Sequence, residues 1–108
     1  MDTIVKFKPN VSMKYVHPKI GHAIDIARHV WELKNISECV VTSMNDSTHS
    51  PTSLHYAGCA VDFRIWNVPE LERDQIVVML KSRLRDEYDI INEGDHYHVE
   101  WQPKRKDD

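Results

Sequence analysis

Two short segments of the chain place histidines and carboxylates at spacings that can bind a metal ion. Residues 55–62 (HYAGCAVD) carry an imidazole and a carboxylate at the two ends of a glycine-containing turn, and residues 95–100 (DHYHVE) alternate polar and apolar side chains. Two imidazoles and one carboxylate suit Zn²⁺ and leave a fourth position for water, which is typical of a catalytic site. His55, Asp62 and His98 are therefore candidate ligands, although each residue taken alone also fits an ordinary strand or turn position.

The alternation of side chains along a strand decides which of these groups can meet. Successive side chains in a strand point to opposite faces, so Asp62 should share a face with Ala60. The same rule puts the polar residues of the second segment on one face and its apolar residues on the other: His96, His98 and Glu100 against Tyr97, Val99 and Trp101. If the two strands are neighbours, His55, Asp62 and His98 can converge.

The elements that must position these groups follow from hydrophobic periodicity and breakers. Apolar residues at three- and four-residue steps predict a helix from Pro18 to about Leu33, with the proline in its first turn. Residues 67–70 (NVPE) look like a capping box that opens a second helix through about residue 84. Its apolar side should contain the following residues: Leu71, Val77, Leu80 and Leu84.

Strands are expected where short β-branched or alternating runs occur. The expected strands cover residues 39–42, 59–64, 88–92 and 96–101. Residues 1–15 should form an irregular or short extended lead-in, residues 44–56 a long loop, residues 93–95 a tight turn and residues 103–108 a frayed tail. The fold class is therefore α+β, with two helices packed on a small, mainly antiparallel sheet.

Composition limits the function classes that fit. The 108 residues predict a single domain (1–108), and 14 Lys and Arg against 17 Asp and Glu give a net charge of −3, unlike a nucleic-acid-binding surface. No apolar run is long enough for a membrane span, and the first ten residues lack the apolar stretch of a signal peptide. We expect a monomer that neither binds nucleic acid nor inserts into a membrane, with reduced cysteines at positions 39 and 59.

Residues 48–62 (THSPTSLHYAGCAVD) resemble the zinc motif SxHxxGxAxD shared by D-alanyl-D-alanine peptidases, bacteriophage endolysin peptidases and the hedgehog signalling domain. The motif positions are matched by Ser53, His55, Gly58, Ala60 and Asp62, and the family's distal HxH by His96-Tyr-His98. His49 also aligns with the hedgehog domain, and the resemblance extends from about residue 40 to residue 101. It implies a hedgehog-like fold with zinc bound by His55, Asp62 and His98.

The resemblance also implies catalytic roles. Glu93 matches a family glutamate before the HxH, with a spacing one residue different from that of the hedgehog domain, and Asp95 matches the acidic-x-x-His spacing of other members. Both stay candidates for the general base, with Glu93 preferred. His96 would donate to the oxyanion, and His49 would close the site unless it is only a solvated loop residue. Arg64 could meet a substrate carboxylate or form a surface salt bridge.

The function implied is that of a zinc metallopeptidase acting on the peptidoglycan stem peptide of a bacterial cell wall. Both D-Ala-D-Ala carboxypeptidase-like and L-Ala-D-Glu endopeptidase-like activities fit the resemblance, in a phage or bacterial protein. We expect synthesis in the cytoplasm, with release to the wall by another protein or association with a virion. The alternative is a catalytically silent, hedgehog-like zinc domain that serves as a binding or phage structural module.

Overall fold

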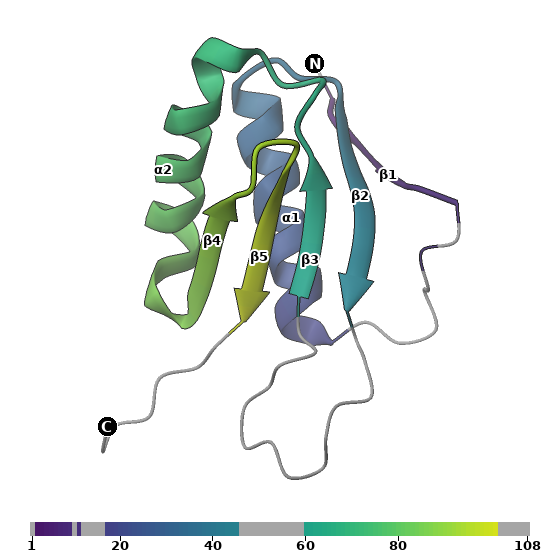
Figure 1. Cartoon of the computed structure of the whole chain (residues 1–108), viewed down its shortest axis with the longest axis vertical. Helices are drawn as coiled ribbons and strands as arrows, with labels where there is room; N and C mark the ends of the chain where they lie inside the picture. The colour runs from purple at the N-terminus through teal and green to yellow at the C-terminus, as the bar shows by residue number, and fades with distance from the viewer. Residues whose placement is uncertain (1, 10, 12–16, 46–59, 102–108) are drawn as a thin grey trace, which may run out of the picture.

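The computed structural model describes residues 2–9, 11, 17–45 and 60–101, and its strands and helices are drawn in Figure 1. The candidate residues His49, Ser53, His55 and Gly58, together with Cys59, lie outside this range. In chain order the elements are β1 (Ile4–Phe7), α1 (Pro18–Leu33), β2 (Glu38–Asn45), β3 (Ala60–Arg64), α2 (Arg73–Leu84), β4 (Tyr88–Asn92) and β5 (His96–Trp101), with 3₁₀ turns at Glu70–Glu72 and Arg85–Glu87. No described helix is long and apolar enough to cross a membrane.

The five strands form one sheet in the order β1-β2-β3-β5-β4. Only β1 and β2 are parallel, and the other neighbouring pairs are antiparallel. The α+β fold with two helices on a mainly antiparallel sheet is thus confirmed. The lead-in contributes the extended edge strand β1, and β2 continues through residues 44 and 45, which the sequence assigned to the long loop.

Both helices cover the same face of the sheet, and their buried side chains belong to a single core. Trp31 of α1 lies at its centre, with its ring centroid 5.8 Å from that of Phe63 on β3 and 6.0 Å from that of Tyr97 on β5. The predicted bounds of α1 are confirmed, and the Nδ1 atom of His17 caps the helix by accepting a hydrogen bond from the backbone N–H of Lys19 (3.0 Å).

The start of the second helix corrects the capping-box prediction. The Nδ2 atom of Asn67 donates to the carbonyl oxygen of Glu38 on β2 (2.8 Å) and does not cap a helix. A 3₁₀ turn follows Pro69, and α2 begins only at Arg73. Because a 3₁₀ turn has three residues per turn, it shifts the apolar register, and Leu71 is 97 % exposed. The buried face of α2 consists of Ile76, Leu80 and Leu84.

Candidate functional site

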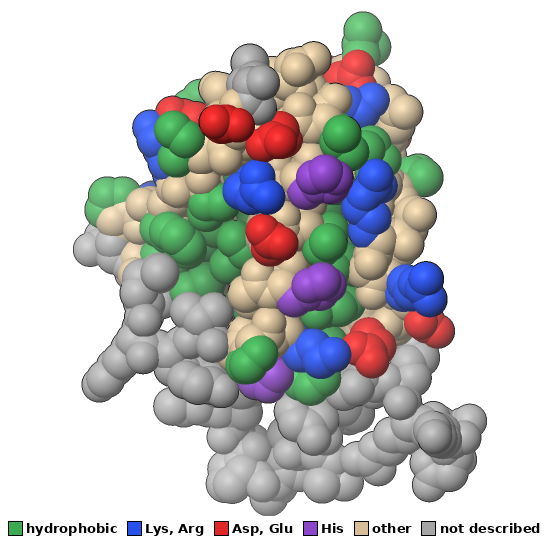
Figure 2. All heavy atoms as spheres, turned by 180° about the vertical axis from the view of Figure 1, so that it is seen from behind, with side chains coloured by type: hydrophobic (Ala, Val, Ile, Leu, Met, Phe, Trp, Pro, Cys, Tyr) green, Lys and Arg blue, Asp and Glu red, His purple; other side chains and the backbone are tan. Residues whose placement is uncertain are grey.

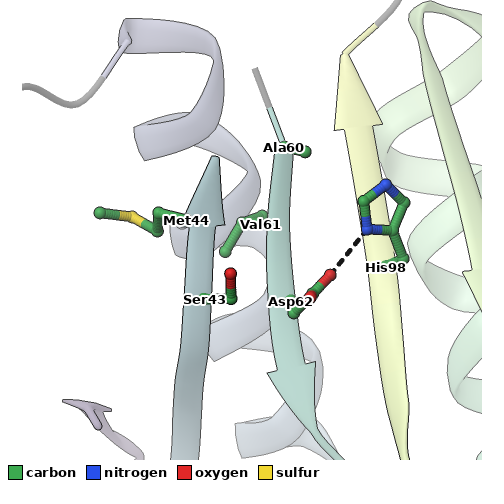
Figure 3. Close-up of a pocket in the computed structure, with 6 residues that line it drawn as sticks. All are labelled: Ser43, Met44, Ala60, Val61, Asp62 and His98. Carbon is green, nitrogen blue, oxygen red and sulfur yellow. Dashed lines mark hydrogen bonds and ion pairs between the residues drawn. The ribbon is translucent and has the colours of Figure 1, made fainter. Parts of the chain in front are cut away.

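Among the described elements, no helix covers the other face of the sheet, here called the open face. It carries the pair at the centre of the candidate site, Asp62 on β3 and His98 on β5. The two residues are directly opposite in the antiparallel register, and Asp62 Oδ1 lies 2.7 Å from His98 Nδ1 (Figure 3). The other ring nitrogen of His98, Nε2, is 3.1 Å from Glu100 Oε1. The two strands are therefore neighbours, which was the condition for convergence, and two of the three candidate ligands come into contact.

His96 forms a second cluster beside this pair. Its Nε2 atom is 2.9 Å from Glu93 Oε1 and 3.8 Å from Asp62 Oδ2, and its Nδ1 atom is 2.6 Å from Asp95 Oδ1. The tight turn between β4 and β5 makes this possible, because Gly94 adopts a φ of +97°, a conformation that suits glycine. The turn thereby places one carboxylate on each side of the imidazole ring.

Hydrogen bonding to carboxylates controls the protonation of both histidines. Partial burial lowers the pKa of His98, but the hydrogen bonds to Glu100 and Asp62 outweigh this effect and raise the pKa above its ordinary value. The pKa of His96 is raised in the same way, because its contacts with Asp95, Asp62 and Glu93 outweigh desolvation. The hydrogen bond to His96 lowers the pKa of Asp95. These contacts therefore stabilise the charged form of each imidazole relative to an imidazole in water.

A hollow of about 260 Å³ opens beside the Asp62–His98 pair. It is lined by Ser43, Met44, Ala60, Val61, Asp62 and His98, which Figure 3 draws as sticks. A shift in the pairing register of β2 between Val41 and Ser43 lies at the level of Asp62. Bulges of this kind bend a strand and redirect side chains next to functional sites. The pair therefore borders a space that small polar groups can enter.

The donor atoms present fit a zinc ion in part. Two ligands about 2.0–2.2 Å from a tetrahedral zinc lie about 3.3 Å apart, so Asp62 Oδ1 and His98 Nδ1 would have to separate by about 0.6 Å from their present 2.7 Å. Metal-bound histidines usually donate their other N–H to a carboxylate, as His98 Nε2 does to Glu100. No group of three or more His, Cys, Asp or Glu suited to a metal occurs among the described residues, which do not include His55.

Searches among models of protein families, curated proteins and solved structures found no match to this chain. The resemblance to the zinc peptidases therefore rests on the residues of this sequence alone.

One member of the site received no role from the sequence. Glu100 contacts the distal nitrogen of His98, and the signal that identifies it is the alternation that puts residues 96, 98 and 100 on one face. The structure brings together Asp62, Glu93, Asp95, His96 and His98 as well, whereas His49 and His55 lie outside the described residues. Cys39 is buried in the core on the helix side of the sheet, away from this cluster.

Proposed function

We propose that this protein is a zinc metallopeptidase that hydrolyses peptide bonds of the peptidoglycan stem peptide. The observation that carries the proposal is the Asp62–His98 pair, which lies on an accessible sheet face with a second imidazole, that of His96, next to it. The motif at residues 53–62 and the HxH at 96–98 support the same interpretation. The class of substrate comes from the resemblance alone.

The charge of the cluster also supports a bound cation. Four carboxylates surround the two imidazoles, those of Asp62, Glu93, Asp95 and Glu100. Carboxylate oxygens at hydrogen-bond distance from both imidazoles favour a cation at short range, where Asp62 and His98 can be its ligands. Asp62 and His98 would hold the ion together with His55, while Glu100 keeps the His98 ring in place through Nε2. A bound zinc ion polarises the scissile carbonyl and lowers the pKa of the attacking water.

The general base is Glu93 in this proposal, and Asp95 has a supporting role. Glu93 and Asp62 approach the same nitrogen of His96, Nε2, so Glu93 lies on the side of the imidazole that faces the Asp62–His98 pair. Asp95 binds the opposite nitrogen, Nδ1. Glu93 can therefore accept a proton from the attacking water and return it to the leaving amine. Asp95 fixes the His96 ring through Nδ1. The Nε2–H of His96 is donated to Glu93 in this structure and becomes available to the carbonyl oxygen once Glu93 has taken the proton of the water.

Digestion of purified peptidoglycan tests the proposal. Mass spectrometry should detect shortened stem peptides and new amino termini, and a chelator should abolish them. Elemental analysis should find close to one zinc per chain, and Asp62→Asn and His98→Gln should both lose it, because each removes a ligand. Asp86→Asn and His29→Gln are matched controls, since both residues are exposed and far along the chain from the pair.

The outcomes separate the alternatives. Bound zinc without turnover on any wall preparation would overturn the peptidase and favour the catalytically silent binding domain. A protein that contains no transition metal and takes up none on addition would overturn the metal site itself.

A further inference from the structure

A second hollow, of about 280 Å³, lies on the same face of the sheet next to the candidate site. It is lined by Lys8, Thr42, Arg64, Trp66, Asp95 and His96. His96 connects the two hollows, because its ring lines the second one and its Nε2 atom lies 3.8 Å from Asp62, which lines the first. A molecule bound at Asp62 and His98 can therefore extend into this second space.

Arg64 is the residue that gives the second hollow its chemistry. It follows Asp62 by two residues on β3 and is opposite His96 in the register with β5. Its guanidinium lies over the ring of Trp66, 4.6 Å from the ring centroid, and Trp66 is 68 % exposed. Stacking on an aromatic face orients a guanidinium while its N–H donors at the edge stay available to a planar anion.

The positive charge of this hollow is not neutralised within the part of the chain that the structure describes. Salt bridges within 4.0 Å occur elsewhere on the surface, but neither Arg64 nor Lys8 forms one with a described carboxylate. Asp95 is the acidic residue of the lining, and its Oδ1 atom is already bound by His96 at 2.6 Å. Arg64 and Lys8 therefore line a space whose one carboxylate, that of Asp95, is already bound to the imidazole of His96.

We infer that this hollow, referred to here as the Arg64 pocket, binds a carboxylate of the substrate. The carboxylate should lie close to the scissile bond, because Arg64 and Asp62 are two residues apart on a strand, or about 6.7 Å. That distance corresponds to roughly two residues of an extended peptide. The role as a substrate pocket rests on the proposed peptidase function. The affinity for a carboxylate is a property of Arg64 and Trp66 and can be measured without turnover.

Binding of a small acid and its neutral amide tests the pocket directly. The probes are N-acetyl-D-alanine and N-acetyl-D-alaninamide, titrated into the purified protein while the indole N–H signal of Trp66 is followed by NMR. The signal is assigned by its loss in Trp66→Phe. The acid should shift the indole N–H signal of Trp66, and the amide should leave that signal unchanged. Arg64→Gln should weaken acid binding about 10- to 100-fold, the range for a lost hydrogen bond to a charged group.

Arg83→Gln is the matched control, because it removes the same charge from an exposed position on α2. It should leave the affinity for the acid unchanged. Equal shifts by acid and amide, or equal weakening in the Arg64 and Arg83 variants, would overturn the carboxylate pocket.

A second measurement distinguishes this inference from the proposed function. Two stem-peptide substrates that differ only in a carboxylate or a carboxamide next to the cleaved bond are compared by kcat/KM. Arg64→Gln should reduce the acid-to-amide ratio about 10- to 100-fold and leave zinc content unchanged. Cleavage with an unchanged ratio would overturn the substrate role of the pocket alone. Acid binding that depends on Arg64, without cleavage of either peptide, would overturn the proposed peptidase and leave a carboxylate-binding domain.

Discussion

The two faces of the sheet are built from different chemistry, and β5 shows the contrast within six residues. Tyr97, Val99 and Trp101 face the helices and are buried. Their neighbours on the open face form the ionisable cluster with Asp62: His96, His98 and Glu100. The helix side is held by apolar packing, which any well-shaped hydrophobic set can supply. The open side concentrates ionisable groups, and the two histidines among them have raised pKa values, which is a pattern found more often at functional sites.

The outer surface of the helix side shows how ordinary surface charges are arranged. Figure 2 shows acidic and basic side chains next to one another on this side of the molecule. On α1, Arg28 lies 3.1 Å from Glu32 and 3.5 Å from Asp25, so that one anion lies one turn before the cation and the other one turn after it. Exposed pairs of this kind contribute little to stability. On the open face, by contrast, carboxylates from two strands and a turn converge on two imidazoles.

The largest effect expected on the open face is on catalysis. Glu93→Ala should lower kcat by about 10²- to 10⁴-fold, the usual cost of losing a general base, and leave the zinc content unchanged. The free energy of unfolding should change little, because the Glu93 side chain is 45 % exposed and its side-chain partner among the described residues is His96. Muropeptide release and elemental analysis of the same preparation check both parts.

Asp95→Ala is the matched variant, because Asp95 binds the other nitrogen of the same imidazole. Its loss should reduce the rate less than the loss of Glu93, since it acts through the orientation of His96. If Asp95→Ala abolishes turnover while Glu93→Ala stays active, the two carboxylates have the opposite roles.

On the helix side of the sheet, a substitution in the core should lower the free energy of unfolding. Phe63→Ala should lower the free energy of unfolding by about 3–5 kcal/mol, because it leaves a cavity against Trp31 in the centre of the core. Arg64, the next residue on β3, faces the open side of the sheet. Arg64→Gln should change the free energy of unfolding by less than about 0.5 kcal/mol. Urea unfolding followed by tryptophan fluorescence measures both. Comparable losses in the two variants would mean that the open face contributes to the fold as much as the core does.

The sequence predicts the framework of this molecule well because alternation and helical periodicity reflect burial. The bounds of α1, β4 and β5 are confirmed, as is the assignment of residues 96, 98 and 100 to one face. The neighbouring position of β3 and β5 was only a condition of the metal hypothesis, since pairing between distant strands leaves no local signal. The register that sets Asp62 against His98 comes from the structure.

Other features depend on which of several possible hydrogen-bond partners a side chain finds in the fold, and sequence patterns do not show this. Asn67 fits a helix cap by type, but in the fold its amide finds the carbonyl of Glu38 on β2, a partner 29 residues away. The contact between Glu100 and His98 cannot be read from the sequence either, because it depends on which nitrogen of His98 faces Asp62. The geometry of Ser53, His55 and His49 stays a prediction, since these residues lie outside the described part of the chain.

Cys39 shows how burial lowers the reactivity of a thiol on the helix side of the sheet. The thiol is free and fully buried on β2. Burial raises the pKa of this thiol from 9.0 to about 12, although the nearby charge of Arg28 acts in the opposite direction. A thiol of this kind should react slowly with alkylating reagents, because the thiolate is the nucleophile.

The smallest predicted effect follows from this pKa. The folded protein keeps the Cys39 proton that the unfolded chain loses above pH 9, so the thiol's contribution to stability is fully present below pH 9 and is lost between pH 9 and about 12. Between pH 7.5 and pH 10, the free energy of unfolding of the native protein should therefore fall by about 1 kcal/mol more than that of Cys39→Ala. The cavity cost of the alanine is independent of pH and cancels in this difference. Parallel stability profiles for the two proteins, or rapid alkylation of Cys39 in the native state, would show that water reaches the helix side of β2 and that the two faces of the sheet differ less than their exposure indicates.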